Sequence, residues 1–147
     1  MKVLYLSNIP SPYRVAFFNE LSKYCQLTVI FERHTAKDRN EEWYDTQFNF
    51  EAIFLNSISI GKESSLSLDI IHYLKSQYDH IIIGGYSTLT AMCAILYLRL
   101  HKIKFILNAD GGFIAEEESN IKKRIKHFFI SSASKYLCSG EKTKTYV

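Results

Sequence analysis

The chain has 147 residues, of which 47% are hydrophobic and 22% charged, and its net charge is +3. This length suits one domain, and the composition is that of an ordinary globular protein, which excludes disordered and fibrous chains. The longest apolar stretch, residues 89–98, is about half of the roughly 20 residues that a membrane span needs, so we expect no membrane-spanning helix.

Short apolar segments alternate with helical patterns along the whole chain. In chain order, the pattern predicts a strand at 2–7, a helix at 13–24, strands at 26–31 and 47–55, a helix at 65–77, a strand at 80–83, a helix at 87–100, a strand at 104–108, a helix at 120–132 and a strand at 135–138. Residues 32–45 are polar and predict a surface loop. The helix at 87–100 is apolar almost all round, so we expect it to be deeply packed.

Strands that alternate with helices predict an α/β fold over residues 1–147, a single Rossmann-like domain. We expect a parallel sheet of about six to seven strands with helices on both faces. In such sheets ligands bind outside the carboxyl ends of the strands, near the switch in strand order. This rule points to the loops at 7–14, 84–87 and 108–113.

The last residues, 135–147, read as a strand, a turn and a helix that has barely begun. A helix cut in its second turn leaves Tyr146 and Val147 without the rest of their apolar face. We therefore expect a partner lobe to follow this domain.

Metal and disulfide sites have no support in the sequence. Cys25, Cys93 and Cys138 are far apart in apolar segments, so we expect reduced, buried thiols. The five histidines show no ligand spacing, and neither H-E-x-x-H nor D-x-D occurs. We expect no metal site and a cytoplasmic protein.

The loop after the first strand reads Ser-Asn-Ile-Pro-Ser-Pro-Tyr-Arg and contains no glycine. Pyrophosphate could not approach this backbone closely, which disfavours an NAD-dependent epimerase or dehydrogenase. Pro10 and Pro12 stiffen the loop and set Tyr13 and Arg14 at the start of the helix. Arg14 either holds an acceptor's phosphate or sugar hydroxyls, or pairs with a local carboxylate.

Two further loops carry candidate site residues. In Gly-Gly-Tyr-Ser-Thr at 84–88, Ser87 or Thr88 can cap the next helix, and we expect an exposed ring at Tyr86 that either stacks on a sugar or has no ligand. In Asn-Ala-Asp-Gly-Gly-Phe at 108–113, Asp110 either accepts a hydrogen bond from a substrate hydroxyl or caps an Asx turn. Gly111 and Gly112 follow it and can take positive φ.

The helix at 121–129 places Ile121, Ile125 and Phe128 on one face, flanked by Lys122, Lys123 and Lys126. Residues 120–147 carry seven basic and one acidic side chain. Such a helix either covers the sheet with a solvated basic face or lies on an anionic bilayer surface. Nucleic acid is a further partner for a basic patch, but no reading motif accompanies it, so we expect none.

The opening Met-Lys-Val-Leu-Tyr-Leu-Ser-Asn-Ile-Pro-Ser-Pro-Tyr-Arg, with the segments Ile-Ile-Gly-Gly-Tyr-Ser and Asn-Ala-Asp-Gly-Gly-Phe, resembles a known family. It looks like the amino-terminal lobe of bacterial glycosyltransferases of family four, the kind encoded among capsule and exopolysaccharide genes. The resemblance implies a two-lobed GT-B fold, whose first lobe receives a polysaccharide or lipid-linked acceptor. Transfer from a sugar nucleotide then retains the anomeric configuration without protein-bound metal.

By the same resemblance, the donor site lies in the second lobe, so this domain binds no cofactor and is inactive alone. Ser11, Tyr13, Arg14 and Tyr86 would face the acceptor, together with Gly111 and Gly112. Asp110 would be catalytic, although many relatives place a histidine there, which leaves open whether Asp110 acts chemically. Lipid-linked acceptors would make sense of a basic helix at the inner face of the cell membrane. The alternative is a stand-alone α/β module that binds a ligand without catalysis.

Overall fold

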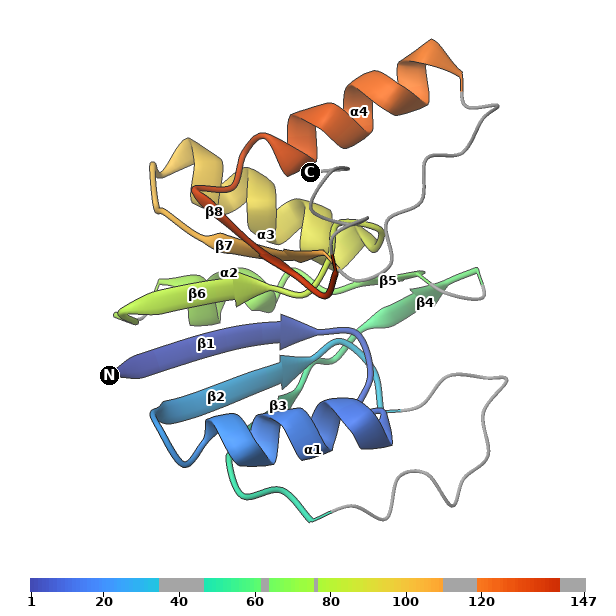
Figure 1. Cartoon of the computed structure of the whole chain (residues 1–147). Helices are drawn as coiled ribbons and strands as arrows, with labels where there is room; N and C mark the ends of the chain where they lie inside the picture. Colours follow the sequence, from blue (N-terminus) through green and yellow to red (C-terminus); the bar gives the residue numbers. More distant parts are fainter. Residues whose placement is uncertain (35–46, 62–63, 76, 110–118, 141–147) are drawn as a thin grey trace.

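The main sheet has six parallel strands in the order β3-β2-β1-β6-β7-β8 within the part of the chain that the computed structural model describes (Figure 1). The described residues are 1–34, 47–61, 64–75, 77–109 and 119–140. The strands of this sheet are β1 (Lys2–Ser7), β2 (Gln26–Phe31), β3 (Glu51–Phe54), β6 (His80–Ile83), β7 (Ile106–Ala109) and β8 (Lys135–Cys138). The order reverses between β1 and β6, as in doubly wound Rossmann folds, so the predicted fold class is confirmed.

Helices cover both faces of this sheet. The helices are α1 (Pro12–Leu21), α2 (Ile70–Leu74), α3 (Leu89–Leu100) and α4 (Asn120–Ile130). Figure 1 shows α1 in front of the sheet and α2 and α3 behind it. We call these two sides of the sheet the α1 face and the α3 face. Only the C-terminal end of α4, at Phe129 and Ile130, is buried, against the cluster of the α3 face.

Alternation along the strands creates one apolar cluster on each face. In β1, Leu4 and Leu6 belong to the larger cluster with α2 and α3, whereas Val3 and Tyr5 belong to the cluster under α1. The α1 face is aromatic, because Phe18 of α1 contacts the rings of Tyr5 and Phe31 at centroid distances of 4.8 and 6.1 Å. These two clusters hold the sheet rigid and so hold its carboxyl edge in place.

The predicted helix at 65–77 is wrong in its first half. Residues Ser64–Leu66 form β5, which pairs antiparallel with β4 (Ile58–Ile60) in a small hairpin, and the helix is only Ile70–Leu74. The side chain of Ser65 is fully buried and bonded to another segment, so a tertiary contact decides the local structure. The predicted strand at 47–55 narrows to β3, and the predicted first helix ends at Leu21.

Helix α3 is less deeply packed than its composition predicts. Thr90, Ala91, Ala94, Ile95 and Leu98 are buried, but the outward positions Leu89, Leu96 and Leu100 are exposed. The expectation of burial all round is therefore wrong for one side of the helix, because the sheet contacts only the other. The three cysteines are free, as expected, but half-buried rather than buried.

Candidate functional site

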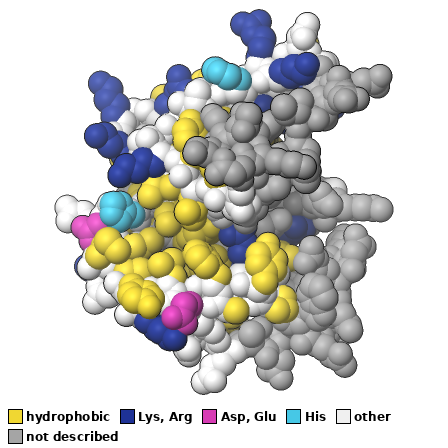
Figure 2. Space-filling view, in the orientation of Figure 1, with side chains coloured by type: hydrophobic (Ala, Val, Ile, Leu, Met, Phe, Trp, Pro, Cys, Tyr) yellow, Lys and Arg dark blue, Asp and Glu magenta, His cyan; other side chains and the backbone are white. Residues whose placement is uncertain are grey.

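A cavity of about 290 Å³ opens at the carboxyl edge of the sheet, on the α1 face. It lies between the start of α1 and the ends of β7 and β8, which is beside the switch in strand order. Its lining residues are Tyr13, Arg14, Phe17, Asn108, Leu137, Cys138 and Ser139. Figure 2 shows hydrophobic side chains gathered on this side of the molecule, between α1 and the strands. The rule for ligand sites in parallel sheets selects this cavity.

Arg14 is held in this cavity by the local structure of α1. Ser11 is the N-cap residue with extended backbone, and Pro12 occupies the first helical turn, where its missing N–H costs nothing. The helix therefore begins at a defined residue, and Arg14 lies in its first turn. The amino end of α1 adds a favourable field for an anionic ligand.

A buried tyrosine fixes the guanidinium of Arg14. The Tyr5 hydroxyl accepts a hydrogen bond from Arg14 Nη1 at 2.9 Å and another from Asn108 Nδ2 at 2.5 Å. Arg14 Nε also donates to the Tyr13 hydroxyl at 3.3 Å. Tyr5 thus connects β1, α1 and β7 on one side of the sheet, so the guanidinium is oriented before any ligand arrives.

Gly84 leaves room for the contact between Tyr5 of β1 and Asn108 of β7, which passes over β6. Strand β6 lies between β1 and β7, and Gly84 follows its last residue. A Cβ on Gly84 would lie 2.5 Å from the Leu6 carbonyl oxygen and 3.2 Å from Cε1 of Tyr5. Only glycine fits here, because the first of these contacts is with backbone that pairs in the sheet. Gly84 therefore serves the site as well as the turn.

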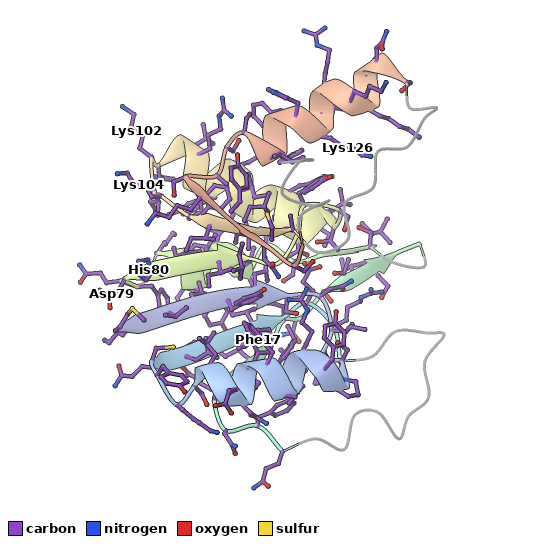
Figure 3. All side chains as sticks on the ribbon, in the orientation of Figure 1. Phe17, Asp79, His80, Lys102, Lys104 and Lys126 are labelled. Carbon is purple, nitrogen blue, oxygen red and sulfur yellow. The ribbon has the colours of Figure 1, made fainter. Side chains whose placement is uncertain are left out.

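The walls of the cavity are largely apolar. Tyr13 is exposed, and the exposed ring of Phe17 is on the side of α1 that borders the strands (Figure 3). Leu137 of β8 is also exposed, beside Asn108 in the register of β7 and β8. Phe18, the next residue of α1, is buried while Phe17 is exposed, since consecutive helical positions point about 100° apart.

A second polar network, on the α3 face, was missed by the sequence reasoning. Glu32 was assigned to a surface loop, but it is only 2% exposed. Its carboxylate accepts hydrogen bonds from Ser65 Oγ at 2.8 Å and from Thr88 Oγ1 at 2.7 Å. The Thr88 hydroxyl also caps α3 by accepting from the Ala91 N–H. Glu32 therefore joins β2, the hairpin and α3.

Burial shifts the pKa of this carboxyl group. Desolvation raises the pKa of Glu32 above its ordinary value, and the hydrogen bonds from Thr88 and Ser65 and the charge of Arg33 lower it by less. Both carboxylate oxygens are occupied by hydroxyls, and the group is sealed from solvent. We interpret Glu32 as an anchor for the loops of the edge. In the sequence, Glu32 is a single polar residue at the end of a strand, and this pattern does not predict a buried anchor.

Of the remaining residues predicted for the acceptor site, the two that the structure describes, Ser11 and Tyr86, do not line the cavity. Ser11 is buried at the N-cap of α1. Tyr86 is half-buried against the cluster of the α3 face, so its expected exposed ring is wrong and it lies across the sheet from Arg14. Asp110, Gly111 and Gly112 lie outside the described residues; β7 ends at Ala109, whose partner in the register is Cys138.

A larger hollow, of about 800 Å³, lies at the opposite edge of the sheet. Met1, Lys2, Gln26 and Asp79 line it, and these residues stand at the amino ends of β1, β2 and β6. Parallel sheets bind ligands at their carboxyl ends, so volume alone does not make this hollow the site.

The lining groups of the cavity can bind and orient a polar ligand. Among the described residues they include a guanidinium, an amide, hydroxyls and a thiol. Across the described ranges, no cluster of His, Cys, Asp and Glu could hold a metal ion. Each described helix falls short of the length and apolarity that a bilayer crossing requires. No protein-family model, curated protein or solved structure matches this chain.

Proposed function

We propose that this chain is the acceptor-binding half of a retaining glycosyltransferase, which moves a sugar from a sugar nucleotide to a polysaccharide or lipid-linked acceptor. The observation that carries the proposal is the guanidinium of Arg14, which lines a cavity with the aromatic residues Tyr13 and Phe17 and is held by the Tyr5 hydroxyl, to which Asn108 also donates. The resemblance of the three quoted loop segments to family-four glycosyltransferases points to the same function.

The cavity suits an acceptor with a sugar ring and a phosphate or hydroxyl groups. The guanidinium of Arg14, oriented by Tyr5 and Tyr13, brings a fixed positive charge that attracts phosphate oxygens and sugar hydroxyls. Aromatic rings such as Tyr13 and Phe17 offer flat apolar surface to the C–H face of a sugar, with a hydroxyl at the tip of the tyrosine. The glycine-free loop at Ser7–Ser11 leaves no cradle for pyrophosphate, so the sugar nucleotide belongs in a second lobe.

A transfer assay tests this proposal. The complete protein is incubated with a panel of labelled sugar nucleotides and a membrane extract as acceptor, and label in the product is measured. Arg14→Lys keeps the charge but loses the planar guanidinium that Tyr5 and Tyr13 orient, so it should raise KM for the acceptor about tenfold and leave KM for the donor unchanged. Lys2→Arg, an exposed residue at the amino edge of the sheet, is the control for a swap between basic residues and should change neither.

Two results would overturn the proposal: no transfer from any donor, or an Arg14→Lys enzyme with unchanged acceptor KM. The described lining groups can all bind a saccharide without chemistry, which supports one alternative, a module that binds a saccharide and transfers nothing. Saccharide binding that Arg14→Lys weakens, in a protein without turnover on every donor, would establish that alternative instead.

A further inference from the structure

The α3 face carries an exposed apolar surface that the proposed function does not use. Helix α4 projects from the sheet, and Figure 1 shows its N-terminal end extending beyond the strands. Ile121, Ile125 and Phe128 are exposed along α4. They follow one another at spacings of four and three residues and therefore form one stripe. The two buried residues, Phe129 and Ile130, lie on another side of the helix, so this stripe does not serve the core.

Helix α3 contributes a second stripe on the same face of the sheet. Leu89, Leu96 and Leu100 are exposed on its outward side, and Leu100 is 79% exposed. The two helices are joined by Arg99 of α3, whose Nη1 donates to Ser132 Oγ at 2.8 Å. The guanidinium carbon of Arg99 also lies 4.3 Å from the centre of the Phe128 ring. We call the two stripes together the α3/α4 surface.

Cations border this surface. Lys122 and Arg124 are exposed, and their helical positions lie on either side of the α4 stripe. Lys102 and Lys104 project outward just after the C-terminal end of α3 (Figure 3). Residues 119–140 include no Asp or Glu, so no carboxylate of α4 offsets these charges. Lys126 differs from its neighbours, because it is half-buried and extends from the side of α4 nearer the sheet (Figure 3).

We infer that the α3/α4 surface docks on a bilayer that contains anionic lipids. Two exposed apolar stripes bordered by cations match the boundary between lipid head groups and acyl chains. A second copy of the chain would bring like charges together. Nucleic acid would leave the leucines and isoleucines in water, and the guanidinium of Arg99 already occupies one face of the Phe128 ring. The inference stands independently of the proposed function.

Vesicle binding tests this inference. The full chain is sedimented with vesicles of equal parts phosphatidylcholine and phosphatidylglycerol, and with vesicles of phosphatidylcholine alone. We expect binding to the anionic vesicles and at least tenfold weaker binding to the neutral ones. Each basic residue at an anionic surface changes partitioning by about fivefold, so Lys122→Gln with Arg124→Gln should weaken binding about thirtyfold. Its matched control, Lys2→Gln with Lys23→Gln, removes two exposed cations elsewhere and should bind like the parent.

A second pair of variants tests the apolar contribution. Leu100→Ser with Ile121→Ser alters two side chains that are 79% and 71% exposed, so the fold is retained. It should weaken binding at least about tenfold. Tyr24→Ser with Ile58→Ser, at sites 75% and 72% exposed, is the control and should bind like the parent.

Several outcomes would overturn the inference. The first is that the parent protein does not bind anionic vesicles. The second is that the test and control variants lose binding equally. The third is that sedimentation depends on the cations but not on Leu100 and Ile121. If the chain dimerises without binding vesicles, and Leu100→Ser with Ile121→Ser abolishes the dimer, the surface binds a second copy instead. Retention on duplex DNA or RNA in place of vesicles would give it to nucleic acid.

Discussion

Tyr5 offers the sharpest test of how the site is built. Its side chain is fully buried, and its hydroxyl accepts one hydrogen bond from a charged donor, Arg14, and one from a neutral donor, Asn108. In Tyr5→Phe the ring keeps its edge contact with Phe18, so packing is preserved and only the hydroxyl is lost. A hydrogen bond to a charged group contributes about 1.5–3 kcal/mol and a neutral one about 0.5–1.5 kcal/mol. We therefore expect the free energy of unfolding to fall by about 2–4 kcal/mol.

Urea denaturation monitored by circular dichroism measures this loss. Tyr24→Phe is the control, because that side chain is 75% exposed, and it should change stability by less than about 0.5 kcal/mol. A double-mutant cycle of Tyr5→Phe and Asn108→Ala should show a coupling free energy of about 1 kcal/mol between Tyr5 and Asn108. A Tyr5→Phe protein less than about 1 kcal/mol below the parent, or zero coupling, would refute the view that this hydroxyl holds the site together.

Two further predictions concern the loops at the same edge. Gly84→Ala places a Cβ against the Leu6 carbonyl and should destabilise the fold by about 2–3 kcal/mol, whereas Gly140→Ala, which meets open space, should be neutral in the same denaturation experiment. Because the pKa of Glu32 is raised, the folded state keeps this proton to higher pH than the unfolded state does. The group's stabilising contribution is therefore complete below the unfolded pKa, and it is lost as pH rises through the folded pKa. Glu32→Gln should remove that loss, and identical slopes of stability against pH for parent and variant would contradict the assignment.

Much of the fold follows from local patterns. The bounds of β1, β2, β6 and β8 agree with the predicted strands, because a short apolar run between polar breaks leaves few other conformations. The hairpin of β4 and β5 was missed because each of its strands has only three residues, too few to show a period. Its strands are held by each other and by the Glu32 carboxylate, a residue more than 30 positions from Ser65 in the chain.

The site was predictable only in part. Tyr13 and Arg14 were expected at the start of α1, and both line the cavity. Leu137 carried no signal, because an apolar residue in a short strand reads as core whichever face it points to. Tyr86 was placed with the acceptor site because its loop leaves a central strand. It packs instead on the α3 face, because it lies three residues beyond the end of β6 and just before α3, where strand periodicity no longer predicts which face a side chain meets.

Composition and periodicity alone determined that this chain forms an α/β domain, and the glycine-free first loop alone argued against a dinucleotide site of the usual kind. Only the tertiary structure decided that β1, β6 and β7 are neighbours, and that Tyr5 therefore reaches both Arg14 and Asn108. The physical reason is the range of the forces involved. Periodicity records which side of an element meets apolar surroundings, whereas strand order depends on packing between segments up to 103 residues apart, as Tyr5 and Asn108 are.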